Sequence, residues 1–147
     1  MKESKKRYVV GIDPGVSTGV AWYDRHEKRV YDYGTSDFWK VHLDFAHGLE
    51  WKSSVVVVIE APKKTRLYAR QDAEQGHRRR EKIAANAGGN AREAELLADG
   101  LESLGYEVRR VTPSRTKWDA EQLKRFTGIE KRTNQHVRDA IALCYGV

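Results

Sequence analysis

Three acidic residues of this chain lie where predicted strands or helices can bring them together, and their types suit metal chemistry. Asp13 and Glu60 each directly follow a largely apolar, strand-like run, and Asp139 lies in a C-terminal helical pattern with His136 three residues before it. If the two strands are neighbours, Asp13 and Glu60 project at one edge of a sheet, and a helix crossing that edge adds the other pair. Crowded carboxylates repel each other unless a cation such as Mg²⁺ neutralises them through oxygen ligands. The set therefore predicts a metal-dependent phosphoryl-transfer site.

Each of these residues also has a plainer interpretation. Asp13 precedes a Pro-Gly pair, which is typical of a turn. His136 and Asp139 share one helix face at i and i+3, which also suits a structural pair that caps the helix. Glu60 is harder to explain in this way, because a charged residue directly after five apolar residues must reach solvent, a partner or a metal. The four positions together are more specific than any one alone.

Length and composition favour one intracellular domain with a polyanionic partner. The chain has 147 residues, which suits a single domain over residues 1–147. Its formal net charge of +6 fits nucleic-acid binding without identifying the partner. No apolar run is long enough to span a bilayer, and no signal-peptide pattern precedes the first strand. The single cysteine, Cys144, excludes an intrachain disulfide and a multi-cysteine zinc site, and its place on an apolar helix side suits an inert core residue. We expect a cytoplasmic protein with no membrane partner and no organic cofactor.

The first half of the chain reads as strands around one helix. Residues 7–13, 19–23 and 30–34 are predicted to form an antiparallel meander. A helix capped by Ser36 or Asp37 runs to about Trp51. The run of residues 55–59 is apolar throughout, as in a central strand covered on both faces.

The second half alternates helices with one more strand. Residues 71–86 are helical in pattern but very polar, and residues 88–90 break the chain before a helix that ends near Leu104, with Gly105 as its C-cap. A strand over residues 107–111, a short helix over residues 118–126 and a final helix from Asn134 follow. In the final helix, positions 136, 139, 140 and 143 are assigned to one face and positions 137, 141 and 144 to another. The order of elements predicts a mixed α/β sheet.

The motifs and their order resemble those of the RuvC family of Holliday-junction resolvases, within the RNase H-like superfamily. The resemblance covers nearly the whole chain and rests on four segments: Gly11-Ile12-Asp13-Pro14-Gly15, Ser17-Thr18-Gly19, Val58-Ile59-Glu60 and His136-Val137-Arg138-Asp139-Ala140. It implies a five-stranded mixed sheet of three antiparallel and then parallel strands, flanked by helices. It also implies a homodimer that resolves four-way DNA junctions by paired nicks, in recombination and repair. The chain length suits a phage-type member, acting in a bacterial or phage-infected cytoplasm.

The resemblance also implies the ligand set and its chemistry. The family's metal-binding positions fall on Asp13, Glu60, His136 and Asp139, and some members carry histidine at the third of these. Two Mg²⁺ or Mn²⁺ ions roughly 4 Å apart would straddle the scissile phosphate. Asp13 would bridge them, Glu60 and Asp139 would each hold one, and His136 would ligate an ion or orient the attacking water. Lys117 matches a lysine that lies near the family's active site and would stabilise charge on the phosphate.

Basic residues supply the expected DNA contacts. One group follows Glu60 and a second precedes the short helix: Lys63, Lys64, Arg66, Arg70, Arg78, Arg79, Arg80, Arg115 and Lys117. Beside the acidic edge they would grip phosphates flanking the cut, although such a run is usually a solvated face. Bacterial family members have a junction-opening aromatic soon after the glutamate, and Tyr68 is the substitute here. Trp118 suits either base stacking or the edge of the core.

The residues leave rival functions open. The segment after the first strand also resembles the phosphate loop of actin-like ATPases and sugar kinases, but those proteins need two such domains. A related nuclease of the same fold would act on RNA or flaps instead of four-way junctions. A non-catalytic junction-binding module is the third alternative, and the complete acidic set argues against it. The apolar stripe of Ala94, Leu97, Leu101 and Leu104 suits the core, with a contribution to a dimer face.

Overall fold

Five strands form one mixed sheet, as predicted. The computed structural model describes residues 6–15, 17–61, 92–112 and 117–145. The strands are β1 (Tyr8–Asp13), β2 (Ser17–Asp24), β3 (Arg29–Asp37), β4 (Val55–Glu60) and β5 (Glu107–Val111). Their order across the sheet is β3-β2-β1-β4-β5. The β1–β2 and β2–β3 pairs are antiparallel, whereas the β1–β4 and β4–β5 pairs are parallel. The expected layout of three antiparallel and then parallel strands is confirmed.

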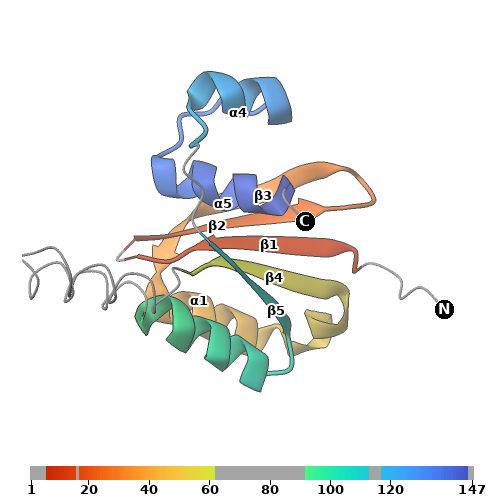
Figure 1. The fold of residues 1–147 in the computed structure, drawn as a ribbon. Helices are drawn as coiled ribbons and strands as arrows, with labels where there is room; N and C mark the ends of the chain where they lie inside the picture. Colours follow the sequence, from red (N-terminus) through yellow and green to blue (C-terminus); the bar gives the residue numbers. More distant parts are fainter. Residues whose placement is uncertain (1–5, 16, 62–91, 113–116, 146–147) are drawn as a thin grey trace, which may run out of the picture.

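Helices cover both faces of this sheet (Figure 1). The helix α1 (Phe38–His47) and a helix over residues 92–103 lie on one face. The helix α5 (Gln135–Tyr145) lies on the other, with α4 (Ala120–Thr127) beyond it. A short 3-10 helix, η1 (Leu49–Ser54), leads into β4. No helix within the described residues is long and apolar enough to cross a membrane.

The sheet separates two apolar cores because alternate residues of each strand point to opposite faces. On the α1 side, Val10 and Ile12 of β1 pack with Val41 and Phe45 of α1. On the α5 side the neighbouring strand positions pack with a second set of buried residues, Val137, Ala140, Ile141 and Cys144. All six residues of β4 are buried, which is why that strand reads as an uninterrupted apolar run.

Two glycines allow α5 to lie directly on the strands. A Cβ atom at Gly11 of β1 would stand 2.1 Å from the carbonyl oxygen of Ala140, and one at Gly19 of β2 would stand 2.2 Å from that of His136. No side chain fits at either position, so the helix backbone approaches the sheet more closely than any larger residue would permit. This close seat fixes the height of α5 above β1 and β2.

The boundaries of several elements differ from the sequence prediction. The helix expected to reach Trp51 ends at His47, and the chain continues through η1 as a 3-10 helix. Asp37 is the N-cap residue of α1, although its side chain makes no capping hydrogen bond. The short helix begins at Ala120 instead of residue 118, because the Asp119 carboxylate accepts from the Gln122 N–H in a capping box.

Buried residues define the inner faces of α5 and of the helix over residues 92–103. Ala140 was assigned to the face of His136 and Asp139, but it is fully buried with the apolar residues, because Gly11 leaves room for the helix backbone there. In the helix over residues 92–103, Ala94, Leu97 and Leu101 are buried in the core and Leu104 packs against it, so the expected core role of this stripe is confirmed, whereas a dimer contact stays a prediction. Gly105 follows that helix with φ +102°, as expected of a C-cap.

Candidate functional site

The alternation of side chains along β1 and β4 places Asp13 and Glu60 on the same face of the sheet. Val10 and Ile12 point to the α1 side, so Asp13 points to the α5 side. In β4, Val56 and Val58 belong to the α5 core, so Glu60 points the same way. The two strands are parallel neighbours, and both end at this edge. The expectation of two adjacent carboxylates at strand ends is confirmed.

The helix α5 adds the third carboxylate. One oxygen from each of Asp13, Glu60 and Asp139 can be chosen so that all three lie within 4.8 Å of one another. Asp13 and Glu60 are 8% and 9% exposed, so water reaches them poorly. Three acids at such spacing form a compact set of hard oxygen donors, which suits a divalent cation such as Mg²⁺ or Mn²⁺.

Lys117 is the cation that the described residues place among these acids. Its Nζ donates to Glu60 Oε1 and to Asp139 Oδ2, at 3.3 Å in each case. Burial raises the pKa of Glu60, the negative charge of Asp13 raises it further, and Lys117 opposes the shift only in part. Burial alone would lower the pKa of Lys117, but its two carboxylate partners outweigh burial, and that pKa is raised. Within the described residues, three carboxylates therefore share a single lysine.

His136 contacts Asp13 but is not one of the three residues whose ligand atoms lie within 4.8 Å of one another. Its Nδ1 lies 3.0 Å from Asp13 Oδ2, and its side chain is half exposed. His136 therefore lies beside the acids, as predicted. In this arrangement the imidazole can hold Asp13 in one orientation, as partners of metal ligands commonly do. A direct role as a metal ligand stays a prediction.

Gln135 and Arg138, whose contacts the sequence analysis missed, link α5 to the segment that carries Lys117, and Gln135 also contacts Asp139. Gln135 Nε2 donates to Asp139 Oδ1 at 2.8 Å and to the carbonyl oxygen of Trp118 at 3.2 Å. Arg138 Nε donates to the same carbonyl at 3.0 Å. These bonds tie the backbone next to Lys117 to α5. The i, i+4 spacing of Gln135 and Asp139 is the sequence signal that could have revealed the first contact.

Trp118 itself packs against other aromatic rings. Its ring centroid lies 5.0 Å from that of Phe126 and 5.8 Å from that of Tyr145. It also borders the apolar core beneath α5. Of its two interpretations, the position at the edge of the core fits this packing.

The expected DNA-contacting residues other than Lys117 lie outside the described residues. They are Lys63, Lys64, Arg66, Tyr68, Arg70, Arg78, Arg79, Arg80 and Arg115. Their role stays a prediction.

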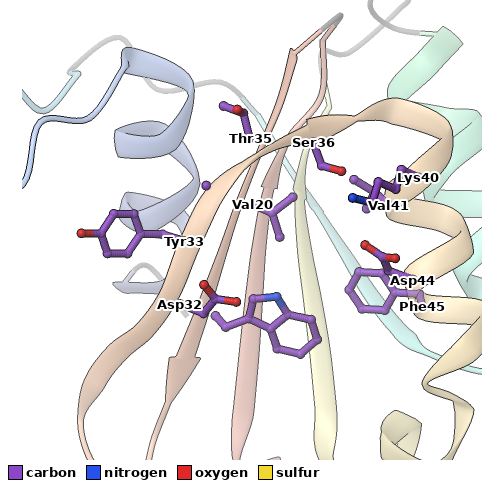
Figure 2. Close-up of a pocket in the computed structure, with 11 residues that line it drawn as sticks. Val20, Asp32, Tyr33, Thr35, Ser36, Lys40, Val41, Asp44 and Phe45 are labelled. Carbon is purple, nitrogen blue, oxygen red and sulfur yellow. The ribbon is translucent and has the colours of Figure 1, made fainter.

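A separate hollow of about 270 Å³ lies on the other face of the sheet (Figure 2). Ser36 of β3 and Lys40 and Asp44 of α1 line it, with Asp32 farther along β3. The Ser36 hydroxyl is buried and has no hydrogen-bond partner among the described residues. The acidic residues that line this hollow, Asp32 and Asp44, come from different elements, so the hollow lacks the group of three carboxylates found beside α5.

Comparisons of the chain with protein-family models, curated proteins and solved structures found no significant match. The three carboxylates at the ends of β1 and β4 and on α5, with one lysine beside them among the described residues, fit a site for divalent cations.

Proposed function

We propose that the protein is a metal-dependent endonuclease that resolves four-way DNA junctions, as the RuvC resemblance implies. The observation that carries this proposal is the trio Asp13, Glu60 and Asp139, with oxygens within 4.8 Å of one another at the edge of the sheet. Three converging carboxylates are the donor set that phosphodiester hydrolases use to hold Mg²⁺ or Mn²⁺. The motif order adds the class of substrate.

Asp13, Glu60 and Asp139 would hold the metal, with two ions in each site. Bound Mg²⁺ or Mn²⁺ supplies a lowered water pKa and neutralises charge on the leaving 3′-oxygen. His136 orients Asp13 through its 3.0 Å contact, and Gln135 orients Asp139 through its 2.8 Å hydrogen bond. These two supports keep the acids in place before substrate arrives, which lowers the cost of assembling the site.

The overall charge supports a polyanionic substrate. The chain carries 27 lysines and arginines against 21 acidic residues. Asp13, Asp24 and Glu60 are buried, so these acids offset the positive charge of the surface less than exposed acids would. DNA binding should therefore weaken steeply with added salt.

A homodimer is part of the proposal, and an exposed apolar patch supports it. Trp39 and Leu43 of α1 and Leu96 of the neighbouring helix are 61%, 43% and 58% exposed, and they border a shallow hollow. A second copy of the chain would cover this patch. Leu96→Glu should shift the molar mass measured by light scattering from dimer to monomer. Leu49→Glu, at another exposed leucine, is the matched control and should leave the dimer intact.

Cleavage of a synthetic four-way junction tests the function. With Mg²⁺ or Mn²⁺, the purified protein should make symmetric paired nicks with ligatable ends, and EDTA should abolish them. Asp13→Asn should lose cleavage while keeping junction binding, and the exposed Asp32→Asn should retain both. Near wild-type cutting by Asp13→Asn would contradict the metal site. Preferential cutting of a flap or an RNA–DNA hybrid in the same assay would mean that this nucleic acid, and not a four-way junction, is the substrate.

The choice of metal is a further test of His136. Imidazole is a better ligand for Mn²⁺ than for Mg²⁺, so we expect equal or higher activity with Mn²⁺. A strong preference for Mg²⁺ would count against His136 as a ligand and leave it as the partner of Asp13.

A further inference from the structure

Lys117 already uses the oxygens that a metal ion would need. Its Nζ lies 3.3 Å from Glu60 Oε1 and 3.3 Å from Asp139 Oδ2. The ammonium group therefore joins two of the three acids, one from β4 and one from α5.

Asp139 has no oxygen free of a donor. Its Oδ1 accepts the Gln135 amide at 2.8 Å, and its Oδ2 accepts Lys117. The Gln135 contact is the shorter of the two, and Gln135 is also anchored to the Trp118 carbonyl. The oxygen that a metal ion can most easily obtain from Asp139 is therefore the one that Lys117 now holds.

Lys117 can leave without disturbing the core. Its side chain is 41% exposed, whereas those of Glu60 and Asp139 are only about a tenth exposed. A lysine ammonium is a point charge on a flexible stem, so rotation of that stem carries it into solvent. A divalent cation between the same two oxygens would repel the ammonium, because like charges so close together disfavour each other.

We infer that Lys117 is a built-in counter-ion of the metal-free site, and that a divalent cation binds by displacing it from Glu60 and Asp139. This inference rests on the metal site of the proposed function. In the metal-free protein, Lys117 limits repulsion among the acids and keeps α5 seated beside β4. Once displaced, its ammonium group remains tethered at the site edge, where it is available to a phosphate oxygen.

Titration of the purified protein with Mn²⁺ by calorimetry, without DNA, tests this displacement. Lys117→Met should bind Mn²⁺ about tenfold more tightly than wild type with the same number of ions, since a charge-assisted contact need no longer be broken. Lys117→Gln should behave similarly and replaces Lys117→Met if that variant fails to fold. Lys117→Arg, which keeps the charge, should bind Mn²⁺ more weakly than Lys117→Met. Lys40→Met, which removes a lysine from the far side of the sheet, should match wild type.

Thermal unfolding of the same proteins gives a second readout. In EDTA, Lys117→Met should have a lower melting temperature than wild type. Added Mn²⁺ should raise the melting temperature of Lys117→Met by more than it raises that of wild type. Unchanged Mn²⁺ affinity in Lys117→Met would overturn the displacement, as would an additional bound ion at unchanged affinity, which would mean that Lys117 stays in place. Absence of Mn²⁺ binding in wild type would remove the metal site and the displacement together. Tighter binding by Lys117→Met in a protein that cuts no junction would uphold the displacement while contradicting the nuclease.

Discussion

Carboxylates are buried at both ends of the sheet, but their pKa values shift in opposite directions. At one end, Asp24 closes β2 and is 5% exposed. Arg7 donates to it through Nε at 3.1 Å and Nη2 at 2.9 Å, and the backbone N–H groups of His26 and Glu27 donate at 2.9 and 3.3 Å. The hydrogen bond from Arg7, helped by those backbone donors, lowers the pKa of Asp24 to about 2. This carboxylate is fully partnered by the protein.

At the other end, three acids face one lysine and one histidine in the part of the chain that the structure describes. Glu60 and Asp139 share one lysine, and Asp13 is held by His136. Burial and the charge of Asp13 raise the pKa of Glu60, in the opposite direction to Asp24. A carboxylate with a complete set of donors stabilises the fold, whereas a cluster short of positive charge favours binding of a cation. The contrast separates a structural acid from candidate functional ones within one sheet.

The largest expected effect comes from removing the close seat of α5 at the acidic end. Gly19→Ala would place a Cβ atom 2.2 Å from the His136 carbonyl oxygen, so α5 must lift from the sheet. We expect a loss of at least about 3 kcal/mol in the free energy of unfolding, measured by urea denaturation. Gly34→Ala is the matched control, because a Cβ there meets nothing within 4 Å. Equal stability of the two variants would show that α5 does not need the glycine.

Neutralising one acid at each end should change stability in opposite directions. In EDTA, Asp24→Asn should destabilise the protein, because the guanidinium of Arg7 loses its charged partner. Glu60→Gln should raise metal-free stability, because a buried charge beside Asp13 is removed. Parallel urea denaturation of both variants measures the two signs. Destabilisation by Glu60→Gln would mean that Lys117 compensates the buried charge of Glu60 completely.

The same two acids should respond to pH in different windows. Asp24 has a depressed folded-state pKa, so its contribution is present above the unfolded value of about 4 and is lost as the pH falls through about 2. Glu60 has a raised pKa, so its charged form weakens the folded state at neutral pH, and protonation relieves this as the pH falls through the raised value. The advantage of Glu60→Gln should therefore shrink on acidification before the deficit of Asp24→Asn does. Denaturation in EDTA across this range should reveal that order, and a reversed order would contradict the assignment.

The smallest expected effect is the absence of a reaction at Cys144. Burial raises the pKa of this thiol to about 12, and the residue is 2% exposed on the side of α5 that faces the sheet. Maleimide should therefore label native protein only slowly at neutral pH and label urea-unfolded protein rapidly. Gly19→Ala should label faster than Gly34→Ala, because a lifted α5 uncovers the thiol. Rapid labelling of the native wild type would indicate that α5 is loosely seated.

Much of the fold and the core of the site could be predicted from local patterns. The uninterrupted apolar run before Glu60 and the similar run before Asp13 identified two strands, because a strand buried on both faces has few alternatives. The place of Asp139 on the last helix followed from its spacing. These features depend on residues close together in sequence.

Contacts between distant residues were harder to predict. The pairing of Arg7 with Asp24 depends on the antiparallel register of β1 and β2, which no local pattern fixes. The burial of Ala140 depends on the absence of a side chain at Gly11, more than a hundred positions away. The contacts of Lys117 with Glu60 and Asp139 join residues that are far apart in sequence, and no local pattern indicates them.

A crystal structure with Mn²⁺, located by its anomalous scattering, tests the metal site and the displacement of Lys117 together. We expect Mn²⁺ bound by oxygens of Asp13, Glu60 and Asp139, with the Lys117 ammonium turned away from Glu60 and Asp139. Asp24 should bind no ion and should keep its contacts with Arg7. No peak at the three acids at saturating Mn²⁺, with Lys117 still joining Glu60 to Asp139, would contradict both.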